Sequence, residues 1–205
     1  MALCFGGDWK DGIEDDDICL GISPAMRESL EDDYCEKGEK YSMKNKAIIT
    51  TSANPFHYGH LDIYKKAKKI FDGVTVIVAY NRDKTSIFDK KKIAAHLEPY
   101  NIPFEILSDD CKTVADYCMQ NNVTHIVRGI RNGTDAEYEL KIDFVNREIF
   151  PNLQTVFLPT SDTFSNISSS VIRELLACGK EDIVMQYMSP AALKIYKEYN
   201  KNELI

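Results

Sequence analysis

Apolar positions follow two alternating patterns from Ala47 onward. Short continuous apolar runs are separated by stretches in which apolar residues recur every three or four positions, as at Leu61, Tyr64 and Ala67. The first pattern is typical of buried strands and the second of helices. The predicted strands are Ala47–Thr50, Val74–Tyr80, Phe104–Leu107, His125–Val127 and Thr155–Leu158. This alternation predicts an α/β fold with a five-stranded parallel sheet and helices on both faces.

Helical spacing also predicts the elements of the second half. Cys111 and Cys118, two turns apart, are expected on one face of a helix before the fourth strand. Two helices at about Ser168–Ala177 and Pro190–Tyr199 are expected to finish the chain. The apolar positions that mark a long helix before the last strand are Tyr138, Ile142, Val145 and Ile149.

Residues 1–46 form a separate acidic extension, and residues 47–205 the domain. The extension holds twelve acidic against six basic side chains, which accounts for −6 of the formal net charge of −7. Its one helical pattern carries Met26, Leu30 and Tyr34 on a single stripe. Two interpretations stay open: a partly disordered, solvated acidic tail, or a segment that docks through this stripe.

Composition excludes several classes of function. The longest apolar runs fall well short of the ~20 residues that span a membrane. The first residues lack the features of a signal or organellar presequence, so the expected location is the cytoplasm. A net charge of −7 argues against a non-specific nucleic-acid binder. None of the six cysteines forms a CxxC pair, as expected for ordinary thiols in a reducing compartment.

The segment 51–60 is the strongest candidate for chemistry. It follows the first predicted strand, contains the turn-forming pair Asn54 and Pro55, and places His57 and His60 in an HxGH motif where a helix begins. The order of strand end, tight loop and helix N-terminus is where parallel α/β folds bind phosphate. Two alternatives remain: a pair of metal ligands, or one helix-capping and one core histidine.

Basic and hydroxyl groups follow other predicted strands. Arg128 and Arg131 flank Gly129 after the strand His125–Val127, and arginine is suited to bidentate phosphate binding. Gly129 is expected to let a ligand approach the backbone. Lys84 lies four residues beyond the second strand.

Three serines, 168–170, open a predicted helix, and Arg173 follows within the first turns. Their hydroxyl and N–H groups are expected to form an anion site there, or Ser168 simply caps the helix. Both roles are compatible.

These motifs together resemble the phosphopantetheine adenylyltransferases, enzymes of coenzyme A synthesis in the nucleotidyltransferase superfamily. The resemblance covers residues 47 to about 200 and implies a Rossmann-like nucleotidyltransferase fold. HxGH and the serine motif are shared among related adenylyltransferases. The run from Arg128 through Tyr138 and Glu139 to Phe157 and Leu158 is similar to this family in particular.

The resemblance implies transfer of the adenylyl group of ATP to 4'-phosphopantetheine, with Mg²⁺ bridging the ATP phosphates and no dedicated protein metal site. His60 would be catalytic, stabilising the transition state at the α-phosphate. The enzyme would be a homo-oligomer. The acceptor would be bound by Ser52, Lys84, Val114 and Arg128. ATP would be bound by Ser52, Ala53, His57, His60, Gly129, Ile130, Arg131, Glu139, Phe164, Ser165, Asn166, Ile167, Ser168, Ser169 and Ser170.

The chain departs from the family pattern at three positions. Thr51 replaces the usual glycine where phosphates approach, so crowding is expected and Thr51→Gly should maintain or improve ATP affinity. Asn54 replaces the usual Asp, as in nicotinamide-mononucleotide adenylyltransferases, and His57 replaces the usual Thr. Two rival functions follow: the same chemistry on a pyridine mononucleotide, or a non-catalytic nucleotide-binding relative.

Overall fold

The fold is seen in a computed structural model that describes residues 45–79, 90–107, 111 and 113–199. These residues all belong to one compact unit, which extends from Lys44 to Ile205. Lys84, Met26, Leu30 and Tyr34 lie outside the described residues. Within them, no helix is long and apolar enough to cross a membrane.

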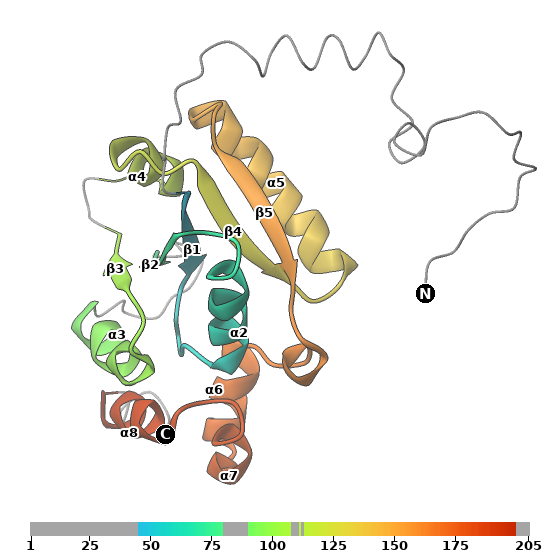
Figure 1. Ribbon diagram of the computed structural model, residues 1–205. Coiled ribbons are helices and arrows are strands. Elements are labelled where there is room, and N and C mark those ends of the chain that lie inside the picture. Colours follow the sequence, from blue (N-terminus) through green and yellow to red (C-terminus); the bar gives the residue numbers. More distant parts are fainter. Residues whose placement is uncertain (1–44, 80–89, 108–110, 112, 200–205) are drawn as a thin grey trace, which may run out of the picture. The chain divides into compact units, whose positions relative to one another are not determined.

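Five parallel strands form one sheet in the order β3-β2-β1-β4-β5. They are β1 (Lys46–Thr51), β2 (Gly73–Val78), β3 (Phe104–Ile106), β4 (His125–Ile130) and β5 (Gln154–Pro159). The chain builds β2 and β3 on one side of β1, then crosses to add β4 and β5 on the other (Figure 1). The carboxyl ends of β1 and β4 are therefore a topological switch point, where open α/β sheets bind ligands.

Helices cover both faces of the sheet, as the sequence predicts. The helices are α2 (Tyr58–Ala67), α3 (Lys90–Leu97), α4 (Val114–Gln120), α5 (Gly133–Ile149), α6 (Ser169–Ala177), α7 (Glu181–Val184) and α8 (Pro190–Tyr199), with 3₁₀ turns at Glu98–Tyr100 and Asp162–Phe164. Ile49 of β1 packs in one core with residues of α2 and α3, and its neighbour Ile48 in another with residues of α4. Alternate residues of a strand face opposite sides, so this division follows from the strand geometry.

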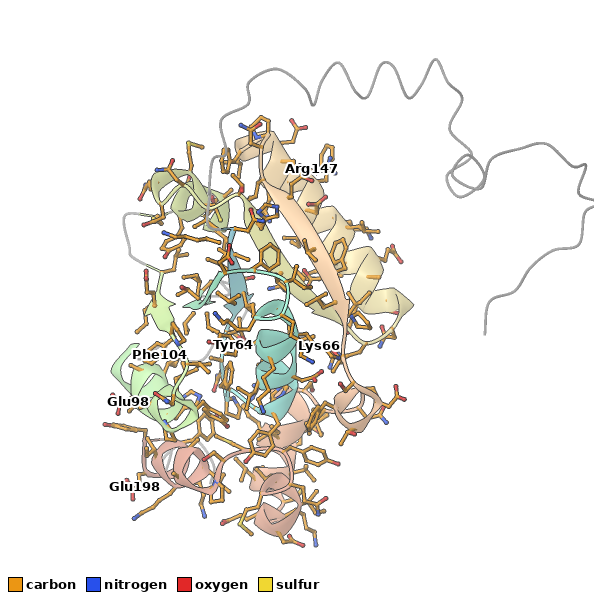
Figure 2. The ribbon with its side chains drawn as sticks, in the orientation of Figure 1. Tyr64, Lys66, Glu98, Phe104, Arg147 and Glu198 are labelled. Carbon is orange, nitrogen blue, oxygen red and sulfur yellow. The ribbon has the colours of Figure 1, made fainter. Side chains whose placement is uncertain are left out.

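The last three helices form a core of their own at one end of the domain (Figure 1). Ile172 and Leu176 of α6 pack there with Val184, Met188 and Leu193. A side chain also joins α2 to the last strand of the sheet. Lys66 of α2, labelled in Figure 2, donates to the carbonyl of Pro159 at the end of β5, at 2.6 Å.

Several predicted boundaries need correction. β4 continues to Ile130, so Arg128 and Gly129 lie within the strand rather than after it. Cys111 precedes α4 instead of sharing a helical face with Cys118, although both thiols are buried. Of the apolar residues that mark α5, Tyr138 is 57% exposed and Val145 52%, whereas Ile149 packs against the core.

Candidate active site

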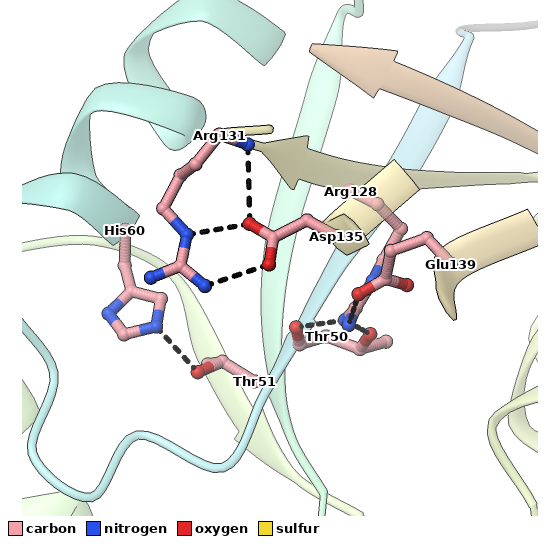
Figure 3. A network of polar contacts seen from close by, with 7 residues as sticks. All are labelled: Thr50, Thr51, His60, Arg128, Arg131, Asp135 and Glu139. Carbon is pink, nitrogen blue, oxygen red and sulfur yellow. Dashed lines mark hydrogen bonds and ion pairs between the residues drawn. The ribbon is translucent and has the colours of Figure 1, made fainter. Parts of the chain in front are cut away.

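A cavity of about 870 Å³ opens at the switch point. Its walls come from the ends of β1 and β4, the start of α2, one side of α5 and the N-terminus of α6. Figure 3 shows how the polar side chains of this region converge. Segments that are far apart in the sequence thus meet where the topology predicts a ligand.

The HxGH motif builds the first turn of α2. His57 is the N-cap, and its Nδ1 accepts from the N–H of Gly59 at 3.1 Å. His60 completes a capping box, because its Nδ1 accepts from the N–H of His57 at 3.2 Å. A Cβ on Gly59 would lie 2.9 Å from the His57 ring, so this turn requires glycine. Both histidines therefore take part in the helix cap, and both line the cavity.

Both imidazoles are held neutral. Burial, reinforced by the charge of Arg131, lowers the pKa of His57 to about 3. Burial also holds the pKa of His60 well below 6.5, with further lowering by His57, Arg128 and Arg131. A neutral imidazole carries one proton, and Nδ1 of His60 accepts from a backbone N–H. The proton therefore sits on Nε2, which faces Thr51 Oγ1 at 3.1 Å (Figure 3).

Arg128 joins three elements beside this ring. Its Nε and Nη2 bind both carboxylate oxygens of Glu139 on α5, at 2.7 and 2.5 Å. Its Nη1 donates to the carbonyl and to the hydroxyl oxygen of Thr50 on β1. A guanidinium has five N–H groups, and the contacts with described residues use four of them, so one N–H on Nη2 could bind an anion. The Arg128–Glu139 pair was not anticipated, since both residues were assigned to ligands.

Arg131 is fixed at the start of α5. Its Nε and Nη2 bind the carboxylate of Asp135 at 2.7 and 3.0 Å, and its Nη1 donates to the carbonyl of Ile167. This pairing holds the pKa of Asp135 below its usual range. Asn132 caps α5 by accepting from the Asp135 N–H. The i,i+4 spacing of Arg131 and Asp135 was the available sequence signal.

The serines of α6 divide between capping and anchoring. Ser168 accepts from the N–H of Val171 as N-cap, as the sequence predicts. Ser169 donates to the carbonyl of Pro55 at 2.9 Å, and Arg173 donates to the carbonyl of Asn54 and to Ser170 Oγ. The α6 N-terminus is thus fastened onto the loop that precedes α2.

Gly129 has a packing role in addition to its place in the cavity wall. A Cβ there would come within 2.7 Å of Ile63 Cγ1 on α2. The sequence interpretation placed a ligand against this backbone, but the close neighbour is the α2 side chain. Gly129 therefore sets the spacing between α2 and β4.

Most predicted site residues do line the cavity. They are Ser52, His57, His60, Val114, Arg128, Gly129, Arg131, Glu139, Phe164, Ile167, Ser168, Ser169 and Ser170. Ala53, Ile130, Ser165 and Asn166 do not, and the Ala53 side chain is fully buried. Sequence reasoning missed further lining residues: Thr50, Asp135, Tyr138, Ile142, Asp143, Asn146 and Thr155.

A metal site built by the protein is absent from the described part of the chain. No group of three or more His, Cys, Asp or Glu side chains there could hold an ion. His57 and His60 use their Nδ1 atoms for backbone N–H groups, which leaves the pair unsuited as joint ligands.

Comparison with known proteins identifies the owner of this sheet and cavity as a nucleotidyltransferase. The profile of the cytidylyltransferase-like family matches residues 48–175. The phosphopantetheine adenylyltransferase of Streptococcus suis is 38% identical over 140 residues, covering 66% of this chain and 85% of the relative. That of Alkaliphilus metalliredigens is 34% identical over 150 residues, covering 69% and 96%. The chain belongs to the phosphopantetheine adenylyltransferase family.

Solved structures share the fold at much lower identity. The nicotinic acid mononucleotide adenylyltransferase of Plasmodium falciparum, complexed with NaAD, superposes with a TM-score of 0.59. The match covers 79% of this chain and 98% of that one at 16% identity. This likeness concerns the fold alone.

Proposed function

We propose that the chain transfers the adenylyl group of ATP to the phosphate of 4'-phosphopantetheine, giving dephospho-coenzyme A and pyrophosphate. The observation that carries the proposal is the neutral His60, whose Nε2–H lies in a cavity wall shared with Arg128 and Arg131. A fixed neutral donor beside two cations suits a phosphorus centre that gains negative charge.

The chain's residues act by position and charge. The acceptor phosphate attacks the α-phosphorus of ATP, the bond to the β,γ-diphosphate breaks, and pyrophosphate leaves, so no protein nucleophile is required. His60 donates to an α-phosphate oxygen, and this bond strengthens in the transition state. Arg128 and Lys84 hold the acceptor phosphate. Arg131, Glu139 and the α6 serines form the ATP side.

Mg²⁺ fits this arrangement as a partner of the phosphates. Among the described residues, no group of three or more His, Cys, Asp or Glu side chains could hold the ion, so it would be held chiefly by ATP oxygens. When bound, the ion supplies charge neutralisation of the departing pyrophosphate.

The departure at Asn54 does not favour a pyridine acceptor. Asn54 Oδ1 accepts from the hydroxyl of Tyr196 on α8 at 2.8 Å, and its carbonyl accepts from Arg173. These contacts give Asn54 a role in joining the first loop to the C-terminal helices. The choice of phosphopantetheine as acceptor is therefore supported by the two relatives, both of which are phosphopantetheine adenylyltransferases.

Pyrophosphate release tests the proposal. Full-length protein with ATP and Mg²⁺ is supplied with phosphopantetheine, or with nicotinate or nicotinamide mononucleotide. We expect turnover with phosphopantetheine, and dephospho-coenzyme A as the second product. Turnover only with a mononucleotide would transfer the assignment to the rival acceptor. No turnover with any of them would favour the non-catalytic relative.

His60→Ala separates catalysis from binding. Losing one transition-state donor costs about 3–4 kcal/mol, so turnover should fall a hundredfold or more while ATP binding is largely retained. Isothermal titration with ATP and single-turnover rates measure the two effects. Near-normal turnover would remove His60 from the mechanism.

We also propose a homo-oligomer, as the family resemblance implies. The described surface of α5 supports it, because Leu140 and Phe144 are 55% and 60% exposed. Phe144→Asp should shift the full-length protein to a smaller species in size-exclusion chromatography with light scattering. A wild-type monomer would end this part of the proposal.

A further inference from the structure

We propose that Thr51 is a positioning residue, whose hydroxyl accepts from His60 Nε2–H and holds the ring so that the same N–H, shared in a three-centre hydrogen bond, also reaches a phosphate oxygen in the cavity. The effect on turnover rests on the proposed function, but the ring geometry does not. Thr51 stands at the end of β1, its Oγ1 lies 3.1 Å from His60 Nε2, and both residues line the cavity (Figure 3).

The protons at this contact can be assigned from backbone donors alone. His60 Nδ1 accepts from the His57 N–H, so a neutral ring carries its proton on Nε2. Thr51 Oγ1 is then the acceptor for Nε2–H. It also accepts from the N–H of Ala53 at 3.0 Å. Both lone pairs of Oγ1 are thus engaged within the protein.

Two contacts thus fix the imidazole from opposite sides. The His57 N–H holds Nδ1 and the Thr51 hydroxyl holds Nε2–H, which sets both the tautomer and the ring plane before substrate arrives. Glycine at position 51 would leave only the first contact. The sequence predicted that Thr51 crowds the phosphates. The structure adds a second effect, because the Thr51 hydroxyl orients the His60 ring.

A purely structural role is the competing explanation. Ala53 has φ 47°, a left-handed conformation that costs free energy for a residue with a side chain. The Thr51 hydroxyl supports this turn through the Ala53 N–H. Removing the hydroxyl could therefore act through the loop instead of through His60, and the test has to separate the two.

The test compares Thr51→Val, which keeps the branched shape, with Thr51→Ser, which keeps the hydroxyl. Losing a neutral hydrogen bond should lower kcat roughly three- to tenfold in Thr51→Val. KM for ATP should change by less than about twofold, since the bond is not made to ATP. Thr51→Ser should recover most of the rate. Unchanged kcat in Thr51→Val, or a loss confined to KM, would overturn the proposal.

Ring ¹⁵N spectra without substrate provide a readout independent of turnover. Wild type should show His60 protonated on Nε2 with a hydrogen-bonded shift, and Thr51→Val should lose that shift. An unaltered His60 signal in Thr51→Val contradicts the proposal even if the enzyme is active. If wild type shows the hydrogen-bonded shift but transfers no adenylyl group, the proposed function fails and the ring geometry stands.

Ala53→Gly controls for the loop, because glycine adopts positive φ without strain. Thr51→Val is measured again in this background, together with melting temperatures. If Thr51→Val lowers kcat by the same factor in the wild-type and in the Ala53→Gly background, the hydroxyl acts through His60. A loss that disappears in the glycine background shows that the hydroxyl serves only the turn, which would overturn the proposal.

Discussion

His96 is a third buried imidazole beside the HxGH turn, and it supports the loop rather than the chemistry. Its Nε2 accepts from the N–H of Phe56 at 3.0 Å, and its Nδ1 lies 3.3 Å from the carbonyl of Lys92. Burial lowers the pKa of His96 to about 4. The same physical cause acts on His57 and His60. The site thus depends on histidines that stay unprotonated in the folded state.

Acid should therefore destabilise the fold through these side chains. His96 titrates near 6.5 when unfolded and near 4 when folded, so the unfolded state binds the extra proton between those values. Stability is fully present above pH 6.5 and is lost as the pH falls toward 4, by up to about 3 kcal/mol for His96. Denaturant unfolding between pH 7 and 4.5 measures this slope.

His96→Gln isolates this contribution. Glutamine can accept from the Phe56 N–H but does not titrate. Wild type should lose stability relative to the variant as the pH falls from 6.5, so their difference in unfolding free energy should depend on pH. A constant difference across the range would contradict the role of His96.

Among the elements, Arg128 connects β4 to α5 and β1. Arg128→Ala should raise KM for phosphopantetheine more than KM for ATP, since the acceptor phosphate loses its guanidinium. It also leaves the Glu139 carboxylate, 10% exposed, without its partner. The free energy of unfolding should fall by roughly 2–3 kcal/mol. This is less than the loss for a fully buried ion pair, because the Arg128 side chain is 25% exposed.

The double variant Arg128→Ala with Glu139→Gln separates the two effects. A neutral amide removes the unpaired charge, so part of the stability should return. The acceptor KM should stay high, because the cation is still missing. Full recovery of KM in the double variant would mean that Arg128 acts through Glu139 and does not touch the acceptor.

Elements with strong apolar patterns could be predicted from sequence, and those defined by tertiary contacts could not. All five strands lie within a few residues of prediction. β1, β2 and β4 carry consecutive buried residues, whereas the residues of β3 and β5 are half-buried or exposed. β4 was predicted too short, because Arg128 and Gly129 near its carboxyl end are residue types that are common in loops. Both residues line the cavity, which explains why this end of the strand is not apolar.

The candidate site shows the same division. HxGH, the arginines and the serines could be found because their residue types signal phosphate chemistry. From sequence, Thr51 was expected only to crowd the phosphates and Asp135 was given no role, since their contacts with His60 and Arg131 are seen only in the folded chain. Ala53 was placed at the ligand by resemblance, yet its side chain is fully buried.

At the scale of the whole molecule, deletion of residues 1–44 should leave an active, folded enzyme. The sheet begins at Lys46, and every described site residue follows it. Turnover, melting temperature and size-exclusion profile of the truncated and full-length chains decide this. Aggregation, an altered oligomeric state or melting several degrees lower would instead favour a docking role for the Met26, Leu30 and Tyr34 stripe. The fate of the extension stays a sequence prediction, because those residues lie outside the described ones.

The bonds from Ser169 and Arg173 to the loop before α2 span 114 and 119 positions in the chain. On the ribosome, the whole sheet emerges before the side chains that fasten that loop. A chain whose synthesis stops before Ser169 therefore lacks both side chains that hold this loop.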